Sequence, residues 1–132
     1  MKYLLDTHIW LWGALQPERL SRRVAMALAD PENELFLSPI SVWELVILVR
    51  KGRFRVQPDI ETWVAKSISE LRLIEAPFTV DVPLAMSSLS FSHADPADQF
   101  LVASAKVFDL TLVTADEKLI RTPGIKVLAN RS

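Results

Sequence analysis

The sequence predicts an α/β fold in which a mainly parallel central sheet is flanked by helices. Short apolar segments of strand length alternate with longer segments that carry helix start and stop signals. The apolar segments show little alternation with polar residues, which is typical of strands buried on both faces of a parallel sheet. Such an order of elements is that of an α/β domain. Because the 132 residues contain no internal repeat or linker, we expect one domain over residues 1–132.

The first half of the chain contains two predicted strands and four predicted helices. Pro17 closes the first helix, and Gly52 is placed to end the third. Ser38 followed by Pro39 is typical of an N-cap with proline at the first helical position. The predicted strands are Tyr3–Leu5 and Leu35–Leu37, and the predicted helices are His8–Leu15, Leu20–Ala29, Ile40–Arg50 and Ile60–Glu70.

The second half continues the alternation. Asp95 followed by Pro96 repeats the cap-then-proline signal. Thr114 with Glu117 matches a capping box for a short helical turn. The predicted strands are Leu71–Ile74, Leu110–Val113 and Ile125–Leu128, and the predicted helical segments are Val82–Leu89, Asp95–Phe108 and Asp116–Ile120.

Composition excludes several classes of protein. Half of the residues are hydrophobic and 23% are charged, so the chain is globular rather than disordered. The absence of cysteine excludes disulfides, thiolate zinc sites and thiol catalysis, and it is compatible with a reducing cytoplasm. The net charge of -1 gives no basic surplus for nucleic acid. No apolar run approaches the roughly 20 residues that span a bilayer, so we expect a cytoplasmic protein without a membrane partner.

Four acidic residues, Asp6, Glu44, Asp98 and Asp116, lie beside or inside apolar runs, where a lone carboxylate is costly. Asp6 and Asp116 follow predicted strands, whereas Glu44 and Asp98 lie on predicted helices that begin after strand ends or loops. Ligands of a parallel sheet bind outside the carboxyl ends of its strands, so all four acids can meet at one edge. Converging carboxylates repel one another unless a cation lies between them. We therefore predict a divalent-metal site and hydrolysis of a phosphodiester by a metal-activated water.

Most of these acids also have a structural interpretation. Asp6 or Thr7 could cap the helix that follows the first strand. Asp95 could be the N-cap of the helix predicted up to Phe108, with Asp98 in its first turn, where the helix dipole favours an anion. Asp116 could have the same first-turn role at the last helical segment. These alternatives leave the participation of Asp95 in a metal site open.

Glu44 resists a structural interpretation best. It is the only charge between Ser38 and Val49. If Ser38 is the N-cap, the capping-box position belongs to Ser41, so Glu44 has no capping role. The alternative is that Glu44 lies on one narrow exposed stripe of the helix. Its neighbours one turn away are Ile40 and Leu48, so no polar stripe supports that alternative.

Four segments, in this order, cover nearly the whole chain: Leu4–His8, Ser38–Leu45, His93–Ala103 and Leu112–Asp116. Together they resemble a PIN-domain ribonuclease, in particular a VapC-type toxin of a toxin–antitoxin pair. Each segment alone is a weak signal, whereas four in order are fairly specific. One departure is Gln99, where relatives with this Asp-Pro motif often carry arginine.

The resemblance implies a PIN-like three-layer fold and an endoribonuclease that depends on Mg²⁺ or Mn²⁺ and is inhibited by a cognate antitoxin. It also implies that Asp6, Glu44, Asp98 and Asp116 form the acidic cluster, with Asp6 and Asp98 as direct metal ligands. Thr114 would orient a carboxylate or a water. Oxygen ligands of this kind suit Mg²⁺ or Mn²⁺, and the absence of cysteine argues against zinc.

The two histidines are interpreted as supporting residues. His8 follows Asp6 and Thr7 at a helix start, where a packing role beside the site is expected. His93 precedes Asp95 and is expected to brace that loop by hydrogen bonds. A histidine can act as a general base, but neither is needed if a metal supplies the nucleophile. Thr7 and Asp95 complete the supporting set.

The densest basic segment comprises Arg50, Lys51, Arg53 and Arg55 around Phe54. These cations could contact RNA phosphates while Phe54 stacks on a base. The alternative is that they are favourable cations at a helix C-terminus next to a solvated loop. The helix C-terminus interpretation is slightly favoured, and RNA binding by this segment is the competing hypothesis.

The four tryptophans, Trp10, Trp12, Trp43 and Trp63, are expected in the core or at an interface. Trp10 and Trp12 cannot share one helical face, so one of them is expected to be exposed for a homodimer or antitoxin contact. Two other functions share the metal chemistry. One is a structure-specific DNA nuclease. The other is a phospho-acceptor signalling domain, which would carry an acidic pair after the first strand, where Asp6 stands alone.

Overall fold

The computed structural model describes residues 1–89 and 95–131. Its strands form one five-stranded sheet in the order β3-β2-β1-β4-β5, and every neighbouring pair is parallel. This confirms the predicted α/β class. The strands are β1 (Lys2–Leu5), β2 (Glu34–Leu37), β3 (Leu73–Glu75), β4 (Thr111–Thr114) and β5 (Lys126–Ala129).

The helices occur where the sequence predicts them, with ends that differ by a few residues. A 3₁₀ turn, η1, lies between the first two helices and begins at Pro17, which had been expected only to close the first helix. The helical elements are α1 (Thr7–Leu15), η1 (Pro17–Arg19), α2 (Arg22–Ala29), α3 (Pro39–Arg50), α4 (Ile60–Leu71), α5 (Asp81–Met86), α6 (Pro96–Val107) and α7 (Glu117–Ile120).

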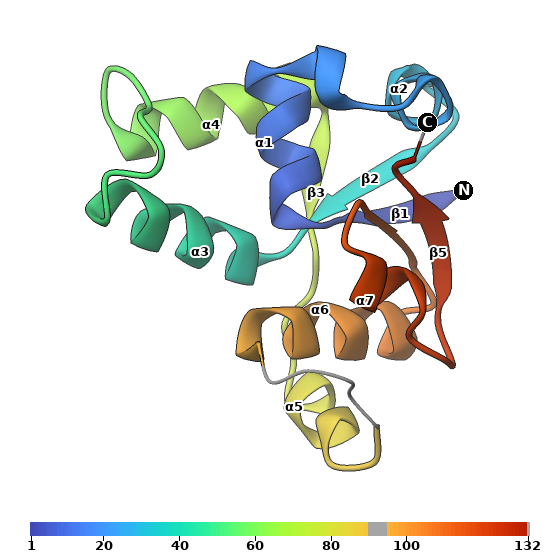
Figure 1. Ribbon diagram of the computed structural model, residues 1–132. Helices are drawn as coiled ribbons and strands as arrows, with labels where there is room; N and C mark the ends of the chain where they lie inside the picture. Colours follow the sequence, from blue (N-terminus) through green and yellow to red (C-terminus); the bar gives the residue numbers. More distant parts are fainter. Residues whose placement is uncertain (90–94, 132) are drawn as a thin grey trace.

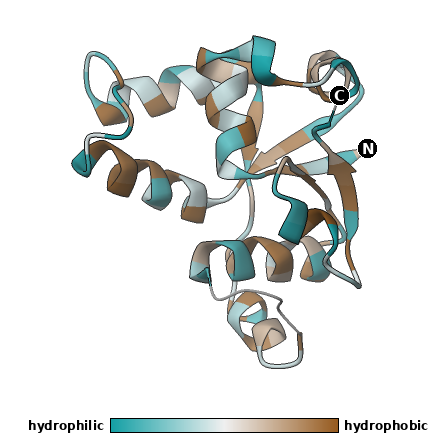
Figure 2. Cartoon of the chain, in the orientation of Figure 1, coloured by the Kyte–Doolittle hydropathy of each residue, from teal (hydrophilic) through white to brown (hydrophobic). Residues whose placement is uncertain are grey.

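Two layers of helices cover the sheet. Figure 1 shows α1, α3 and α4 on one side of the strands, and α5, α6 and α7 on the other. Successive strand residues point to opposite faces, so Leu5 and Val113 belong to the core under α1 and α4, whereas Leu4 and Leu112 belong to the core under α6. Figure 2 shows the hydrophobic residues of these central strands between the two layers. The central strands are therefore buried on both faces, as their unalternating sequences predicted, whereas the edge strand β3 exposes Ile74 and Glu75.

Local signals set the position of α3. The Ser38 hydroxyl accepts a hydrogen bond from the Ile40 amide at 3.1 Å, which confirms the predicted N-cap. At the other end Gly52 has φ of 70°, a left-handed conformation that glycine adopts without steric cost. The Arg53 amide donates to the Leu48 carbonyl at 2.9 Å, and the Gly52 amide donates to Val49 at 3.0 Å. This pair of bonds is a Schellman motif, and it fixes the backbone direction at Arg53.

Two sequence predictions were wrong in detail. The third strand was predicted from Leu71, but Leu71 is the last residue of α4, and Arg72 has a left-handed φ of 56° that separates helix from strand. The capping box of Thr114 with Glu117 does not form. Asp116 is instead the N-cap of α7, because its carboxylate accepts from the Lys118 amide at 2.9 Å.

The tryptophans also differ from the prediction. Trp10 is fully buried, and its indole donates to the Ser67 hydroxyl at 3.1 Å. Trp12 is half-buried, so neither member of the Trp10–Trp12 pair is exposed. The exposed tryptophan is Trp43, at 51% of its surface. Trp10 and Trp12 lie on different faces of α1. Both faces are covered at least in part because α1 packs against the sheet, α3 and α4.

Candidate metal and nuclease site

The site begins where the direction of the strand order changes. In the order 3-2-1-4-5, strands β1 and β4 are neighbours, and the chain leaves them toward opposite layers. Open α/β sheets bind ligands in the crevice outside the carboxyl ends of strands at such a switch point. Leu5 is paired with Val113, so the next residues, Asp6 and Thr114, emerge side by side.

Asp6 is held rigidly at this point. Its backbone amide donates to the Val113 carbonyl at 2.9 Å, which continues the ladder beyond β1. One carboxylate oxygen accepts from the Thr7 amide at 2.7 Å, and the other accepts from the Thr114 hydroxyl at 2.7 Å. Asp6 is therefore the N-cap of α1, as the structural interpretation predicted, and it is at the same time 8% exposed at the strand end.

Thr7 connects the first strand to α3. Its hydroxyl donates to the carboxylate of Glu44 and is also hydrogen-bonded to the Ser41 hydroxyl at 2.9 Å. Glu44 is half-buried rather than part of an exposed stripe. This contact shows why the sequence offered Glu44 no structural partner nearby: its partner lies 37 positions away along the chain.

The start of α6 supplies two further acids. Asp95 is the N-cap, and its side chain accepts from the Ala97 amide at 3.0 Å. Asp98 lies in the first turn, which helix-dipole arguments favour for an anion. Asp98 is nevertheless only 8% exposed. A favourable interaction with the helix dipole does not require burial, so the dipole alone does not explain the position of Asp98.

The last acid arrives from the loop after β4. The Asp116 amide donates to the Thr114 hydroxyl at 3.1 Å, so one threonine hydroxyl links Asp116 to Asp6. The side chain of Asp116 is exposed and caps α7. Thr114 itself is completely buried. Its hydroxyl therefore fixes both the Asp6 carboxylate and the backbone at Asp116.

These side chains line one cleft of about 350 Å³, which we call the acidic cleft. All four acids predicted as the site lie there, although they come from four different parts of the chain. The sequence predicted a supporting role for His8, and it lies at the same cleft; His93 lies outside the described residues. The residues that line the acidic cleft are Asp6, His8, Trp12, Glu44, Asp95, Asp98, Ala115 and Asp116.

The acids of this cleft raise one another's pKa values. Burial raises the pKa of Asp6, although its bonds from Thr114 and Thr7 act in the opposite direction. Burial, followed by the charge of Asp6, also raises the pKa of Glu44. The pKa of Asp98 rises to about 8, first through burial and then through the charges of the other acids. Such shifts arise when carboxylates share a site without a compensating cation.

The donor set fits a hard divalent cation. Within residues 1–89 and 95–131, no three acidic or histidine side chains are close enough as placed to coordinate one ion together. Mg²⁺ retains several of its waters and binds proteins through one or two carboxylates, so it does not need such a group. Two carboxylates with further acids lining the same cleft suit Mg²⁺, and Mn²⁺ accepts the same oxygen donors.

The basic segment divides into two parts. Arg50 and Lys51 are exposed at the end of α3 and do not line the acidic cleft. Arg53 and Arg55 line a separate cleft that also contains Arg19. The sequence reasoning missed Arg19 and Ser41. No local signal identifies either one, because each acquires its neighbours only through the packing of α1.

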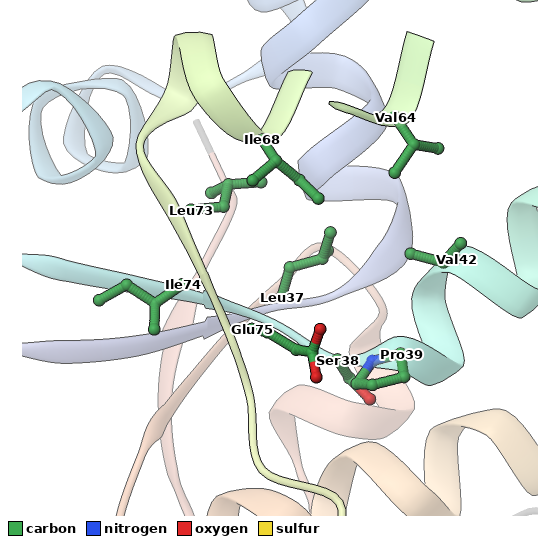
Figure 3. Close-up of a pocket in the computed structure, with 9 residues that line it drawn as sticks. All are labelled: Leu37, Ser38, Pro39, Val42, Val64, Ile68, Leu73, Ile74 and Glu75. Carbon is green, nitrogen blue, oxygen red and sulfur yellow. The ribbon is translucent and has the colours of Figure 1, made fainter. Parts of the chain in front are cut away.

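A third cleft is apolar and has a different character. Its volume is about 400 Å³, and it lies between α3, α4 and the edge strand β3. Figure 3 shows Val64 and Ile68 of α4 near Leu37 and Val42, with Glu75 at one end of the cleft. With one carboxylate among its described lining residues, this cleft is not a metal site.

An all-parallel α/β sheet with carboxylates clustered at its switch point is an arrangement that can bind a divalent cation. A family model described as the PIN domain matches residues 3–125. The chain therefore belongs to the PIN domain family. Among the described residues, no helix is long and apolar enough to cross a membrane.

Known proteins resemble the chain over most of its length. It is 29% identical over 116 residues to Ribonuclease VapC22 of Mycobacterium tuberculosis, with 88% of both chains covered. The fold matches a chain of VapBC2 from Rickettsia felis, crystallised with a DNA fragment of its promoter, with a TM-score of 0.74, 20% identity and 98% of both chains covered. It also matches VapBC-1 from nontypeable Haemophilus influenzae, with a TM-score of 0.68, 20% identity and 98% of both chains covered.

Proposed function

We propose that the chain is a metal-dependent endoribonuclease and the toxin of a toxin–antitoxin pair. The observation that carries this proposal is the convergence of Asp6, Glu44, Asp98 and Asp116 in one cleft at the β1–β4 switch point. Membership of the PIN domain family and the similarity to a relative named a ribonuclease support the choice of RNA as substrate. The cytoplasm is the proposed location.

Asp6 and Asp98 would hold the cation, Mg²⁺ or Mn²⁺, and Glu44 and Asp116 would hold it through water or bind a second ion. When bound, the cation would polarise the phosphate, activate the attacking water and stabilise the leaving oxygen. Because water is the nucleophile in this chemistry, no nucleophilic side chain is needed. The hydrolysis breaks one P–O bond of the RNA backbone and adds water across it.

The chain's own residues prepare the cleft for this task. Thr114 and the Thr7 amide bind both oxygens of Asp6, which orients the carboxylate and partly offsets the effect of burial on its pKa. The Thr7 hydroxyl positions Glu44 in the same way. Because the buried acids disfavour their own ionisation, the cleft gains most from a ligand of positive charge.

The proposal includes a protein partner. The solved structures that match this fold include VapBC complexes from several bacteria, and the second component of such a pair is the antitoxin. We infer that a cognate antitoxin binds and inhibits this chain, and that the chain forms a homodimer. Co-expression with the product of a neighbouring reading frame, followed by co-purification, tests the first of these partners.

The central test is cleavage of RNA by purified Asp98→Asn protein. The expected loss of Mg²⁺-dependent cleavage is more than about 100-fold, because partners one step removed from a metal already change activity by about 10- to 100-fold. Asp81→Asn is a matched control, since Asp81 lies in the first turn of α5, is exposed, and does not line the acidic cleft. Growth arrest on expression should disappear with Asp98→Asn and persist with Asp81→Asn. Full cleavage by the Asp98→Asn protein would contradict the proposal.

A structure-specific DNA nuclease remains the alternative with the same metal chemistry. Matched RNA and DNA substrates, each as single strand and as duplex, separate the two functions. RNA cleavage without DNA cleavage is the expected result. Cleavage confined to a DNA structure would replace the proposed substrate while leaving the acidic cleft as the site.

A further inference from the structure

A second cleft adjoins the acidic cleft and has the opposite charge. Its volume is about 620 Å³, and its walls come from α1, η1 and the segment that follows α3. Among its described lining residues are three arginines and no carboxylate. We call it the basic cleft; the lining residues that matter here are His8, Trp12, Arg19, Arg53, Phe54 and Arg55.

The two clefts share a wall. His8 and Trp12 line both of them. The His8 and Trp12 rings are 5.8 Å apart between centroids, and the Arg19 guanidinium lies 4.3 Å from the centroid of the Trp12 ring on the basic side. An extended ligand that binds at the carboxylates of the acidic cleft can therefore continue past Trp12 into the basic cleft.

The backbone fixes two of the arginines at this place. The Schellman motif at Gly52 holds the Arg53 amide against the Leu48 carbonyl. Phe54 then packs against the hydrophobic core as a half-buried anchor, so it is less available for stacking than the sequence suggested. Arg53 and Arg55, on either side of this anchor, are exposed.

The charges of these arginines are available to a ligand. Within residues 1–89 and 95–131, the ion pairs include no bond from Arg19, Arg53 or Arg55 to a carboxylate. Arg19 makes a long bond of 3.4 Å to the Gln16 side chain and otherwise lies over Trp12. Surface arginines are usually dispersed among carboxylates, whereas three without such partners in one cleft, one of them over an aromatic ring, form a site for a planar or multivalent anion.

We propose that the basic cleft is a subsite for the nucleotide next to the scissile phosphate of a single-stranded RNA. Arg53 and Arg55 bind its phosphate, and Trp12 with Arg19 forms the surface on which its base stacks. Arginine forks match phosphate oxygens, and single-stranded RNA is bound by stacking of bases on aromatic rings and guanidinium planes. The inference rests on the proposed function, since the acidic cleft must hold the scissile phosphate.

The proposed subsite also answers an electrostatic problem. The acidic cleft repels the phosphates of any RNA that approaches it, and a bound cation offsets only the charge at the scissile position. The net charge of -1 supplies no general attraction. A local group of three arginines beside the acids attracts the neighbouring phosphate where attraction is needed.

The test compares Arg53→Gln/Arg55→Gln protein with Arg22→Gln/Arg23→Gln protein, which loses the same charge from exposed positions of α2 outside both clefts. The probe is a random-sequence single-stranded RNA oligonucleotide, and binding is measured in EDTA so that no cleavage occurs. The cleft variant should bind at least about tenfold more weakly. The slope of log K against log salt should fall by about 0.7, because the two arginines neutralise one phosphate of the single strand. The control should keep the parent affinity and slope.

The stacking surface is tested with two variants of one residue. Trp12→Phe keeps an aromatic face and should retain RNA binding to within about threefold, whereas Trp12→Leu keeps apolar packing and should lose about tenfold. Circular dichroism and thermal unfolding establish that both variants fold. Equal RNA affinity of the leucine and phenylalanine variants would overturn the stacking role.

Hydrolysis of bis(p-nitrophenyl) phosphate separates failure of the subsite from failure of the proposed function. This small phosphodiester needs the acidic cleft but not its neighbour, so the Arg53→Gln/Arg55→Gln protein should hydrolyse it at the parent rate while losing RNA cleavage. Absence of metal-dependent hydrolysis in the parent protein would overturn the proposed function, and RNA binding in EDTA would still decide the subsite. Unchanged RNA affinity and salt slope in the cleft variant would overturn the subsite. Loss of antitoxin binding with RNA binding intact would also overturn it, because it would assign the cleft to a protein.

Discussion

The two sides of the acidic cleft hold their carboxylates by different means. Asp6, at the strand side, and Asp98, at the helix side, are both 8% exposed. Asp6 accepts hydrogen bonds from Thr7 and Thr114 that lower its pKa and partly offset its burial. Burial first, and then the charges of four other carboxylates, raise the pKa of Asp98 to about 8.

This contrast separates two tasks within one site. The strand side is oriented by hydrogen bonds that exist before any cation arrives, because Thr114 and the Thr7 amide belong to the folded framework. On the helix side, burial and the neighbouring acids raise the pKa of Asp98, so a ligand of positive charge is favoured there. Under the proposed function, such a site would combine fixed geometry with a preference for a cation.

Thr114→Val should have the largest effect among the variants that leave every acid in place. Valine preserves the shape of the side chain but removes the hydroxyl that donates to Asp6 and accepts from the Asp116 amide. The expected loss is about 10- to 100-fold in metal affinity and in RNA cleavage. Titration with Mn²⁺ in a calorimeter and a cleavage assay measure the two quantities.

Thr111→Val is the control for that variant. Thr111 is buried on the same strand, but it is the first residue of β4, whereas Thr114 is the last. Its replacement should leave metal affinity within about twofold of the parent value, since it lies at the opposite end of β4 from the acidic cleft. If both valine variants bound Mn²⁺ equally well, the strand side would not be oriented by Thr114.

Asp98→Asn should stabilise the metal-free protein at alkaline pH, which is the next largest effect. When folding raises the pKa of a carboxyl from 3.8 to about 8, the folded state binds more protons than the unfolded state between those pH values, so stability falls as pH rises through that range. Stability of the parent should therefore fall as pH rises from about 4 through about 8, and asparagine removes this contribution. We expect a gain of about 1–2 kcal/mol at about pH 9 and little or none near pH 4.

Urea unfolding in EDTA at both pH values measures this difference in the free energy of unfolding between variant and parent. With saturating Mg²⁺, we expect the parent to be the more stable of the two. A cation that binds only the folded parent stabilises it by about 2.7 kcal/mol at 100 times its Kd, and the asparagine variant should lose most of that gain. Asp6→Asn is the comparison variant for Asp98→Asn. We expect Asp6→Asn to stabilise the metal-free protein less, because the Thr114 hydroxyl then donates to an uncharged acceptor. An equal gain in both variants would show that the two sides of the cleft do not differ.

Much of the fold follows from the sequence for identifiable reasons. Unalternating apolar segments indicate a parallel sheet buried on both faces, and the caps at Ser38 and Asp95 fix where α3 and α6 begin. The four acids stand out in the sequence because each interrupts an apolar context. Their convergence at one cleft follows once the strand order is 3-2-1-4-5, since this order brings the ends of β1 and β4 together.

What the sequence could not supply were partners far apart along the chain. Thr114 matched a local capping box, yet its hydroxyl bonds Asp6, 108 positions away. Thr7 bonds Glu44 only because α1 packs against α3. The same packing brings Arg19 and Arg53 to one cleft. A sequence pattern identifies hydrogen-bond partners a few residues away, whereas tertiary packing determines whether a side chain bonds to that neighbour or to a residue far along the chain. The extent of a single domain over residues 1–132 stays a prediction.

Asp116→Ser should have the smallest effect, and it separates two roles of one residue. Asp116 is exposed, caps α7 and also lines the acidic cleft. Serine is an equally good N-cap, so the free energy of unfolding should change by no more than about 0.5 kcal/mol, whereas Asp116→Ala should lose about 1 kcal/mol. If Asp116 also holds the cation through water, serine should lower RNA cleavage by about tenfold. Parent-level cleavage by a stable Asp116→Ser protein would show that this acid is only a helix cap, and that Asp6, Glu44 and Asp98 form the site without it.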